Sequence, residues 1–280
     1  MQDKQFEMII SDFDGTLSEG HVVPKPTVDA IKRYQEDGGL FVLCTGRPTV
    51  SAKTVMKNSG VNPDAIISFQ GAETVIKNEY AYRGGLDAKL VSKIADDLSK
   101  KFGRELGVFK DDVLYVQGDS DIIGKYVAFY KEFGGTYAYK DDISKFADEV
   151  DGCFSKMVMM KDPNEDVSEI YEYLEKTYGD KIFANSGASF ILEIISKKYS
   201  KYTSSKFVAE KFCVDESKVL TVGDSTNDLP LLQYGFGVAV ESGSLELKQT
   251  AKYIAPSIEK MPVKILIDDI LFGKKITPKN

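Results

Sequence analysis

The stretch that most constrains the fold is Asp12–Leu17, which reads Asp-Phe-Asp-Gly-Thr-Leu. It follows the apolar residues 8–10, which predict a short buried strand. Because side chains alternate in a strand, Asp12 and Asp14 point the same way, and Gly15 permits a turn directly after them. The pattern predicts a strand that delivers two acids to its carboxyl end, where open α/β sheets bind ligands. Taken alone, these residues also fit a solvated Asp-Gly turn.

The segments that follow alternate between strand and helix patterns. Residues 40–44 and 65–69 predict buried strands, and helical stripes over 28–34 and 49–58 alternate with them. We place the N-cap of the first helix at Thr27. This β-α-β-α-β order predicts a parallel sheet with right-handed crossovers.

A different pattern fills the middle of the chain, beginning with a long amphipathic helix over 86–102. Further strands are expected at 106–110, 113–117, 154–160, 182–185 and 190–195, and helices at 122–133, 143–150 and from Asp162-Pro163. The α/β rhythm returns with helices at 203–212, 228–234 and 262–272 and strands at 219–222 and 238–240. We therefore expect an α/β core made of residues 1–83 and 197–280, with an inserted α+β domain at 84–196.

Composition excludes several classes of function. The 280 residues include 36 Lys and Arg against 43 Asp and Glu, a net charge of −7, which disfavours general binding to nucleic acid or an anionic membrane. No apolar run approaches the roughly 20 residues of a membrane span. Cys44, Cys153 and Cys213 lie far apart and there is one histidine, so neither a disulfide framework nor a zinc site is expected. We expect a cytoplasmic monomer or weak homo-oligomer with reduced thiols.

Four short stretches are expected at or just beyond the ends of predicted elements, on one edge of the sheet. They are Asp12–Thr16, Thr45-Gly46-Arg47, Ser200-Lys201 and Gly223–Asp228. Several carboxylates would then share a small volume with one lysine, which raises carboxylate pKa values unless a cation compensates them. Mg²⁺ favours a few carboxylates together with water and substrate phosphate. A carboxylate can also attack phosphorus as a nucleophile.

Taken in order, these stretches resemble the motifs of the haloacid dehalogenase superfamily of phosphotransferases. The insertion lies between the second and third motifs, which resembles the Cof-type hydrolases with a type IIB cap. The resemblance covers nearly the whole chain. It implies a Rossmann-like, doubly wound parallel-sheet core with an inserted α+β cap domain.

The resemblance also implies a mechanism. Asp12 would attack phosphorus to form an aspartyl-phosphate, and Asp14 would protonate the leaving oxygen and later take a proton from the hydrolytic water. A Mg²⁺ ion would bind Asp12, the backbone carbonyl of Asp14 and Asp224, with Ser225 or Asp228 nearby through water.

The family's phosphate-binding positions can be carried over in the same way. The phosphoryl oxygens would be held by the backbone amides of Phe13 and Gly46, the Thr45 hydroxyl, Lys201 and Asn227.

Some of these positions have simpler interpretations or depart from the family. Thr45 could belong to a helix cap, and Lys201 lies among other lysines, as on a solvated basic face. Tyr202 follows that lysine where the family usually has glycine, and Gln70 stands where the family often has asparagine. Arg47 could bind substrate or form a structural salt bridge. The sequence leaves the roles of Arg47 and Gln70 open.

We expect an enzyme: a Mg²⁺-dependent phosphatase, a phosphoric monoester hydrolase acting on small phosphorylated metabolites such as sugar phosphates or phosphorylated cofactors. A sugar phosphomutase with the same nucleophile is the alternative, and a noncatalytic sensor of phosphorylated ligands is a third hypothesis. No Gly-x-x-x-x-Gly-Lys-Ser/Thr loop is present, which disfavours a nucleotide-driven kinase or ATPase. Candidate specificity residues in the cap are Asp111, Asp112, Tyr115, Lys140 and the Asn185-Ser186-Gly187 turn.

Overall fold

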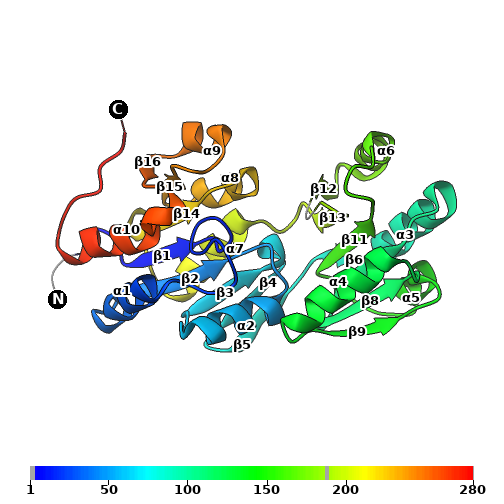
Figure 1. The fold of residues 1–280 in the computed structure, drawn as a ribbon, viewed down its shortest axis with the longest axis horizontal. Coiled ribbons are helices and arrows are strands. Elements are labelled where there is room, and N and C mark those ends of the chain that lie inside the picture. Colours follow the sequence, from blue (N-terminus) through cyan, green and yellow to red (C-terminus); the bar gives the residue numbers. More distant parts are fainter. Residues whose placement is uncertain (1–3, 187–188, 280) are drawn as a thin grey trace. The chain divides into compact units, whose positions relative to one another are not determined.

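The computed structural model describes residues 4–186 and 189–279, so Gly187, one of the candidate specificity residues, lies outside the described residues. The chain divides into two compact units. The core unit comprises Met1–Ala81 and Ser200–Asn280, and the inserted unit comprises Tyr82–Tyr199. Figure 1 shows the blue beginning and the red end of the chain together in the core unit.

One sheet organises the core unit, with strand order β16-β15-β14-β1-β2-β3-β4-β5. Its strands are β1 (Met8–Ser11), β2 (Leu40–Cys44), β3 (Ala65–Ser68), β4 (Glu73–Ile76), β5 (Glu79–Arg83), β14 (Val219–Gly223), β15 (Phe236–Val240) and β16 (Tyr253–Ala255). Strands β16 to β3 are parallel, and β4 runs antiparallel to β3. Strand β1 lies between β14 and β2 and is buried along its whole length, which explains the apolar run over residues 8–10.

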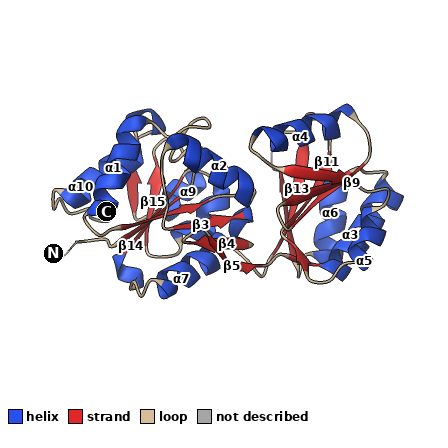
Figure 2. Ribbon diagram, turned by 90° about the horizontal axis from the view of Figure 1, so that it is seen from below, coloured by secondary structure: helices blue, strands red, loops and turns tan. Residues whose placement is uncertain are grey.

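Helices cover both faces of this sheet, as a doubly wound fold requires. The α-helices are α1 (Lys25–Glu36), α2 (Thr49–Ser59), α7 (Lys201–Lys211), α8 (Leu229–Leu232), α9 (Leu245–Thr250) and α10 (Pro262–Leu271). Short 3₁₀ turns are η1 (Phe69–Gly71), η2 (Glu216–Lys218), η3 (Thr226–Asp228) and η4 (Ile258–Lys260). Figure 2 shows α7 on one face and α1 and α10 on the other. On the α7 face, Val208 and Ala209 belong to one buried cluster with Met8 and Ile10 of β1.

The inserted unit has a sheet of its own, with strand order β12-β13-β11-β7-β8-β9. Its strands are β7 (Leu106–Lys110), β8 (Val113–Gln117), β9 (Thr136–Tyr139), β11 (Lys156–Met160), β12 (Ile182–Ser186) and β13 (Ile191–Ser196), and β6 (Leu86–Asp87) pairs separately with β10 (Cys153–Phe154). Its helices are α3 (Ala88–Phe102), α4 (Asp121–Glu132), α5 (Ile143–Asp148) and α6 (Ser168–Tyr178). Figure 2 shows α3, α5 and α6 on one face of this sheet and α4 on the other.

The start of α1 differs from the prediction. Thr27 is not the N-cap, because the helix begins at Lys25 and Thr27 is buried inside its first turn. Proline is tolerated in that first turn, where its missing N–H would have no partner in any case, so Pro26 extends the helix toward its N-terminus.

The inserted unit brings further corrections. The helix expected from residue 86 begins at Ala88, because Asp87 caps it by accepting a hydrogen bond from the Lys89 amide (3.0 Å). Asp162 and Pro163 do not open a helix, since α6 begins at Ser168. Strands β9 and β16 and helix α9 were not predicted. All three are short. Strands β9 and β16 lie at sheet edges, where most of their side chains are not buried, so their sequences show only a weak apolar pattern.

None of the described helices combines the length and the apolar character needed to cross a membrane.

We predict that residues 82–199, produced alone, unfold in one cooperative thermal transition, because the unit encloses its own apolar core. Circular dichroism at 222 nm measures the transition. A Leu98→Ala variant of the fragment is the control: it removes a fully buried side chain and should lower the Tm by about 8 °C or more. A gradual loss of signal in the unaltered fragment would contradict the prediction.

Candidate active site

Strand pairing brings the first and fourth motifs together. Asp12 directly follows β1, and its amide donates a hydrogen bond to the carbonyl of Val222 in β14 (2.9 Å). Asp224 directly follows β14, which runs parallel to β1 with Ser11 opposite Val222. Both acids therefore stand at the carboxyl edge of the sheet, as the sequence predicts for parallel strands.

Lys201 is the first residue of α7, and its position is fixed by a capping box. Ser200 Oγ accepts from the Thr203 amide (3.2 Å), and Thr203 Oγ1 accepts from the Ser200 amide (3.0 Å). The Lys201 side chain is only 1% exposed, and its Nζ lies 2.6 Å from Oδ1 of both Asp12 and Asp228. The alternative of a solvated lysine is therefore wrong.

Asp228 holds this lysine from a turn that it also closes. Its side chain is fully buried, and its Oδ2 accepts hydrogen bonds from the amides of Asp224 (3.1 Å) and Ser225 (3.2 Å). Gly223 is required here, because a Cβ at that position would lie 2.5 Å from the Asp228 Cβ. Both oxygens of Asp228 are thus engaged by Lys201 or by backbone amides.

The segment after Asp12 approaches Asp224 closely. Thr16 Oγ1 donates a hydrogen bond to Asp224 Oδ1 (3.1 Å). Gly15 has a φ of 80°, and a Cβ there would collide with the Asp224 carboxylate. The sequence assigned Gly15 to a turn and gave Thr16 no role. The signal was already present in the Asp-Gly-Thr spacing, because a small residue and a hydroxyl follow the acids at fixed positions.

The three buried or partly buried acids form a strongly negative cluster. One oxygen each from Asp12, Asp224 and Asp228 lies within 4.8 Å of the others. Burial, together with Asp228, raises the pKa of Asp12 well above its usual value even though Lys201 opposes the shift. Burial and Asp228 also raise the pKa of Asp224 to about 6. Hard carboxylate oxygens in excess over one ammonium group suit a divalent cation such as Mg²⁺.

Asp14 occupies a different environment from Asp12. Its side chain is 57% exposed and receives two hydrogen bonds from Arg47, from Nε to Oδ2 (2.8 Å) and from Nη2 to Oδ1 (2.5 Å). The Arg47 guanidinium lies 4.7 Å from the centre of the buried Phe13 ring, and its Nη2 is 3.1 Å from Nδ1 of His21. Arg47, whose role the sequence left open, therefore binds one of the candidate site acids.

The remaining predicted phosphate-binding residues lie at this edge or in the turn after β14. Thr45 follows β2, and its buried hydroxyl accepts a hydrogen bond from the Arg47 amide (3.2 Å). It does not cap α2, whose N-cap is Pro48 and which has no side-chain cap. Gly46 lies between Thr45 and Arg47. Asn227 Oδ1 accepts from Ser225 Oγ (2.7 Å), and the described contacts give it no hydrogen bond to Asp12 or Lys201.

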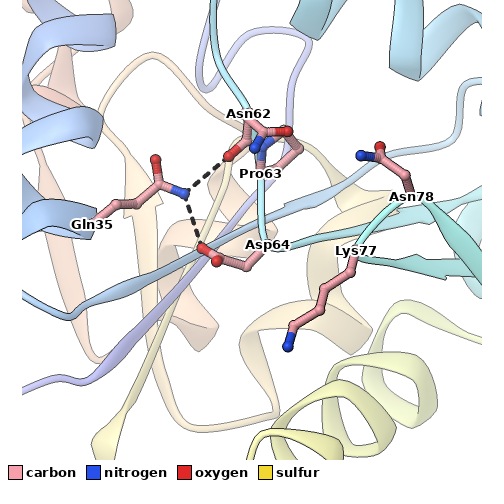
Figure 3. A pocket seen from close by; sticks show the side chains of 6 residues that line it. All are labelled: Gln35, Asn62, Pro63, Asp64, Lys77 and Asn78. Carbon is pink, nitrogen blue, oxygen red and sulfur yellow. Dashed lines mark hydrogen bonds between the residues drawn. The ribbon is translucent and has the colours of Figure 1, made fainter.

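A pocket elsewhere in the core unit is separate from this cluster. Its lining residues are Gln35, Asn62, Pro63, Asp64, Lys77 and Asn78. Figure 3 shows the Gln35 amide bonded to Asp64, whose Oδ2 also accepts from the Phe41 amide (2.9 Å). Asp64 precedes β3 and Phe41 is near the start of β2, so this pocket lies at the amino edge, opposite Asp12. It contains no predicted site residue.

Comparison with known proteins gives matches along most of the chain. A family model described as haloacid dehalogenase-like hydrolase matches residues 9–266. The 5-amino-6-(5-phospho-D-ribitylamino)uracil phosphatase YitU of Bacillus subtilis is 25% identical over 87% of this chain and 90% of its own length.

Solved structures share the fold. The protein TM0651 of Thermotoga maritima superimposes with a TM-score of 0.82 at 20% identity, over 95% of this chain and 97% of its own. A structure titled as the subclass IIB sugar phosphatase BT4131 superimposes with a TM-score of 0.76 at 17% identity, over 96% of this chain and 100% of its own. At this identity the likeness shows the fold alone.

We predict that Asp224 makes the metal-free protein less stable as pH rises. Its folded-state pKa of about 6 exceeds the ordinary aspartate value of about 3.9, so the folded state retains a proton that the unfolded state loses. The free energy of unfolding should therefore fall between about pH 4 and 6, and the fall should be smaller in Asp224→Asn. Thermal melts of both proteins in EDTA at pH 4 and pH 7 measure this change in stability.

In those melts the Asp224→Asn protein should gain stability relative to the wild type as pH rises. Asp180→Asn, at an exposed position of the inserted unit, is the matched control and should leave the pH dependence unchanged. Parallel pH profiles for wild type and Asp224→Asn would show that Asp224 is not a source of the pH dependence.

Proposed function

The chain belongs to the haloacid dehalogenase-like hydrolases, of the Cof type, and from this membership we propose that it is a Mg²⁺-dependent phosphatase of small phosphorylated metabolites. The observation that carries the proposal is the buried lysine held between Asp12 and Asp228, with Asp224 beside them. We propose that Asp12 is the nucleophile and forms an aspartyl-phosphate. We further propose that the protein acts in the cytoplasm, as a monomer or weak homo-oligomer.

The contacts of Asp12 support its role as nucleophile. Its Oδ1 is paired with Lys201, which orients the carboxylate and leaves Oδ2 for phosphorus or a metal ion. The side chain is 8% exposed, so it is largely buried at the end of the strand. Lys201, Thr45 and the amides of Phe13 and Gly46 would stabilise the charge on the phosphoryl oxygens.

The donor set fits Mg²⁺ for chemical reasons. Asp12 and Asp224 would hold the ion with the carbonyl of Asp14, while Asp228, whose oxygens are both engaged, would act through Lys201 or a water near Ser225. When bound, Mg²⁺ offsets the repulsion between the carboxylates and the negatively charged phosphate.

Asp14 is proposed as the general acid and base. In the free protein Arg47 donates to both of its oxygens, so both are engaged in the ion pair. Before Asp14 can protonate a leaving oxygen, this ion pair has to loosen. A phosphate group arriving beside Gly46 offers Arg47 an alternative anion, so substrate binding would release Asp14 for proton transfer.

The substrate class is supported by the relatives. YitU is named for a substrate that is a phosphate monoester of a ribityl compound, and BT4131 is titled a sugar phosphatase. We propose that this chain acts on similarly small phosphorylated metabolites. We also propose that the inserted unit is a type IIB cap that excludes bulk water and selects the leaving group. Asp111, Asp112, Tyr115, Lys140 and Asn185 remain candidates for that selection.

Asp12→Asn should abolish Mg²⁺-dependent phosphate release from a panel of phosphorylated metabolites, because an amide cannot form the acyl-phosphate. The variant should stay folded, since Lys201 keeps its buried ion pair with Asp228 when the Asp12 carboxylate is lost. Phosphate release and thermal melting measure the two effects. Wild-type turnover in a verified Asp12→Asn preparation would disprove the nucleophile.

Chelation of divalent cations should silence the wild-type enzyme by at least about 100-fold, because uncompensated carboxylates repel the substrate phosphate. The assay compares phosphate release in EDTA with release after Mg²⁺ is restored in excess. Recovery on adding Mg²⁺ is the control for irreversible unfolding. Undiminished activity in EDTA would remove the metal from the proposal.

A further inference from the structure

Gln70 lies beside the proposed phosphate-binding segment but has no role in the proposed function. It belongs to η1, the turn that follows β3 at the carboxyl edge of the sheet. The backbone N–H of Gln70 donates to the Thr45 carbonyl (3.2 Å), and the backbone N–H of Phe69 donates to the Arg47 carbonyl (3.0 Å). Two backbone hydrogen bonds therefore fasten this turn to the segment Thr45-Gly46-Arg47.

The side chain of Gln70 packs against Gly46. A Cβ at Gly46 would lie 2.5 Å from Gln70 Nε2 and 3.1 Å from its Cδ, so the glycine makes room for this carboxamide. Gln70 is only 6% exposed, and its Oε1 has no hydrogen-bond partner among the described residues. A buried oxygen without a partner opposes folding. An apolar side chain would fill the same space without that cost.

The backbone at Gln70 is also unfavourable. Gln70 has a φ of 57° and Phe69 a φ of 50°, in the left-handed region that side chains other than Gly, Asn and Asp rarely adopt. The turn is braced on α7, because Ser204 Oγ donates to the Gly71 carbonyl (2.8 Å) and a Cβ at Gly71 would collide with the Ser200 carbonyl. This is the same helix that begins with Lys201. The fold thus holds Gln70 in place despite two local costs.

We propose that Gln70 contacts the substrate: its carboxamide oxygen accepts a hydrogen bond from a hydroxyl group on the leaving group of a phosphate monoester bound beside Gly46. The inference rests on the proposed function. Because Oε1 is closed to water in the free protein, the contact forms when the carboxamide rotates toward the bound ligand. The residue then favours esters with a hydroxyl near phosphorus over esters without one.

The test compares Gln70→Leu with wild type on two kinds of phosphate monoester. Glycerol 3-phosphate, ribose 5-phosphate and glucose 6-phosphate carry hydroxyl donors, and p-nitrophenyl phosphate carries none on its leaving group. We expect kcat/KM to fall about three- to tenfold on the best hydroxyl-bearing ester and less than twofold on p-nitrophenyl phosphate. The Tm should equal or exceed that of wild type, because an unpaired buried oxygen is removed.

Thr27→Val is the matched control. Thr27 is also buried with an unpartnered side-chain oxygen, but it lies in α1 and has no place in the proposed site. This variant should leave kcat/KM unchanged on both kinds of ester. If Gln70→Leu fails to fold, Gln70→Asn, which suits the left-handed backbone and keeps a shorter carboxamide, should still reduce the preference for hydroxyl-bearing esters.

Several outcomes would overturn the proposal. An equal loss on both kinds of ester would assign Gln70 to the phosphoryl group or to the fold, and unchanged kinetics would remove it from the site. A lowered Tm with an unchanged substrate preference would make it a packing residue. Each of these leaves the proposed function intact as long as Asp12→Asn is inactive.

Discussion

The two ion pairs of Lys201 are the interaction on which the rest of the structure depends. Its Nζ lies 2.6 Å from both Asp12 and Asp228, and all three side chains are nearly or fully buried. Buried charges of this kind are tolerated only when partners and further hydrogen bonds satisfy them. The capping box of α7 and the amides after β14 provide that support. The lysine thereby joins three chain segments that are remote in sequence.

One lysine does not neutralise the three carboxylates of the cluster. The remaining negative charge affects both the stability of the fold and the proposed metal binding. Two of the three acids have raised pKa values because burial and neighbouring carboxylates disfavour ionisation. Under the proposed function, the same crowding that destabilises the metal-free protein would favour a bound cation and place the proposed nucleophile at the strand end. Gln70 is likewise a position in the proposed site that opposes folding. Its side-chain oxygen is buried without a partner, and its backbone is left-handed.

Sequence reasoning predicted the parts of the fold that are governed by burial. Strands β2, β7 and β8 have the predicted bounds, because continuous or alternating apolar residues meet clear turns at both ends. Edge strands β9 and β16 escaped prediction, because their tertiary partners rather than their own sequence hold them. The doubly wound core was confirmed. The type of cap and the roles of the individual site residues remain predictions.

In the site, the rule that parallel strands end at one edge of a sheet was enough to predict that Asp12 lies near Asp224. The same rule could not predict which side chains pair with each other. The burial of Lys201 could not be read from a lysine-rich stretch, and the contact between Arg47 and Asp14 depends on how the turn after Asp12 folds back. The first partnership depends on where α7 begins and the second on a turn, and sequence periodicity predicts neither.

The topology of the insertion has a direct consequence for this site. The chain leaves the core unit after Ala81 and returns at Ser200, one residue before Lys201. Within the inserted unit, Tyr82 and Tyr199 stack at 6.0 Å, so the outgoing and returning segments are held together. The returning segment then passes directly into the capping box that fixes the lysine. Ser200 and its two peptide bonds are therefore all that separates Tyr199 from Lys201, which pairs with the proposed nucleophile.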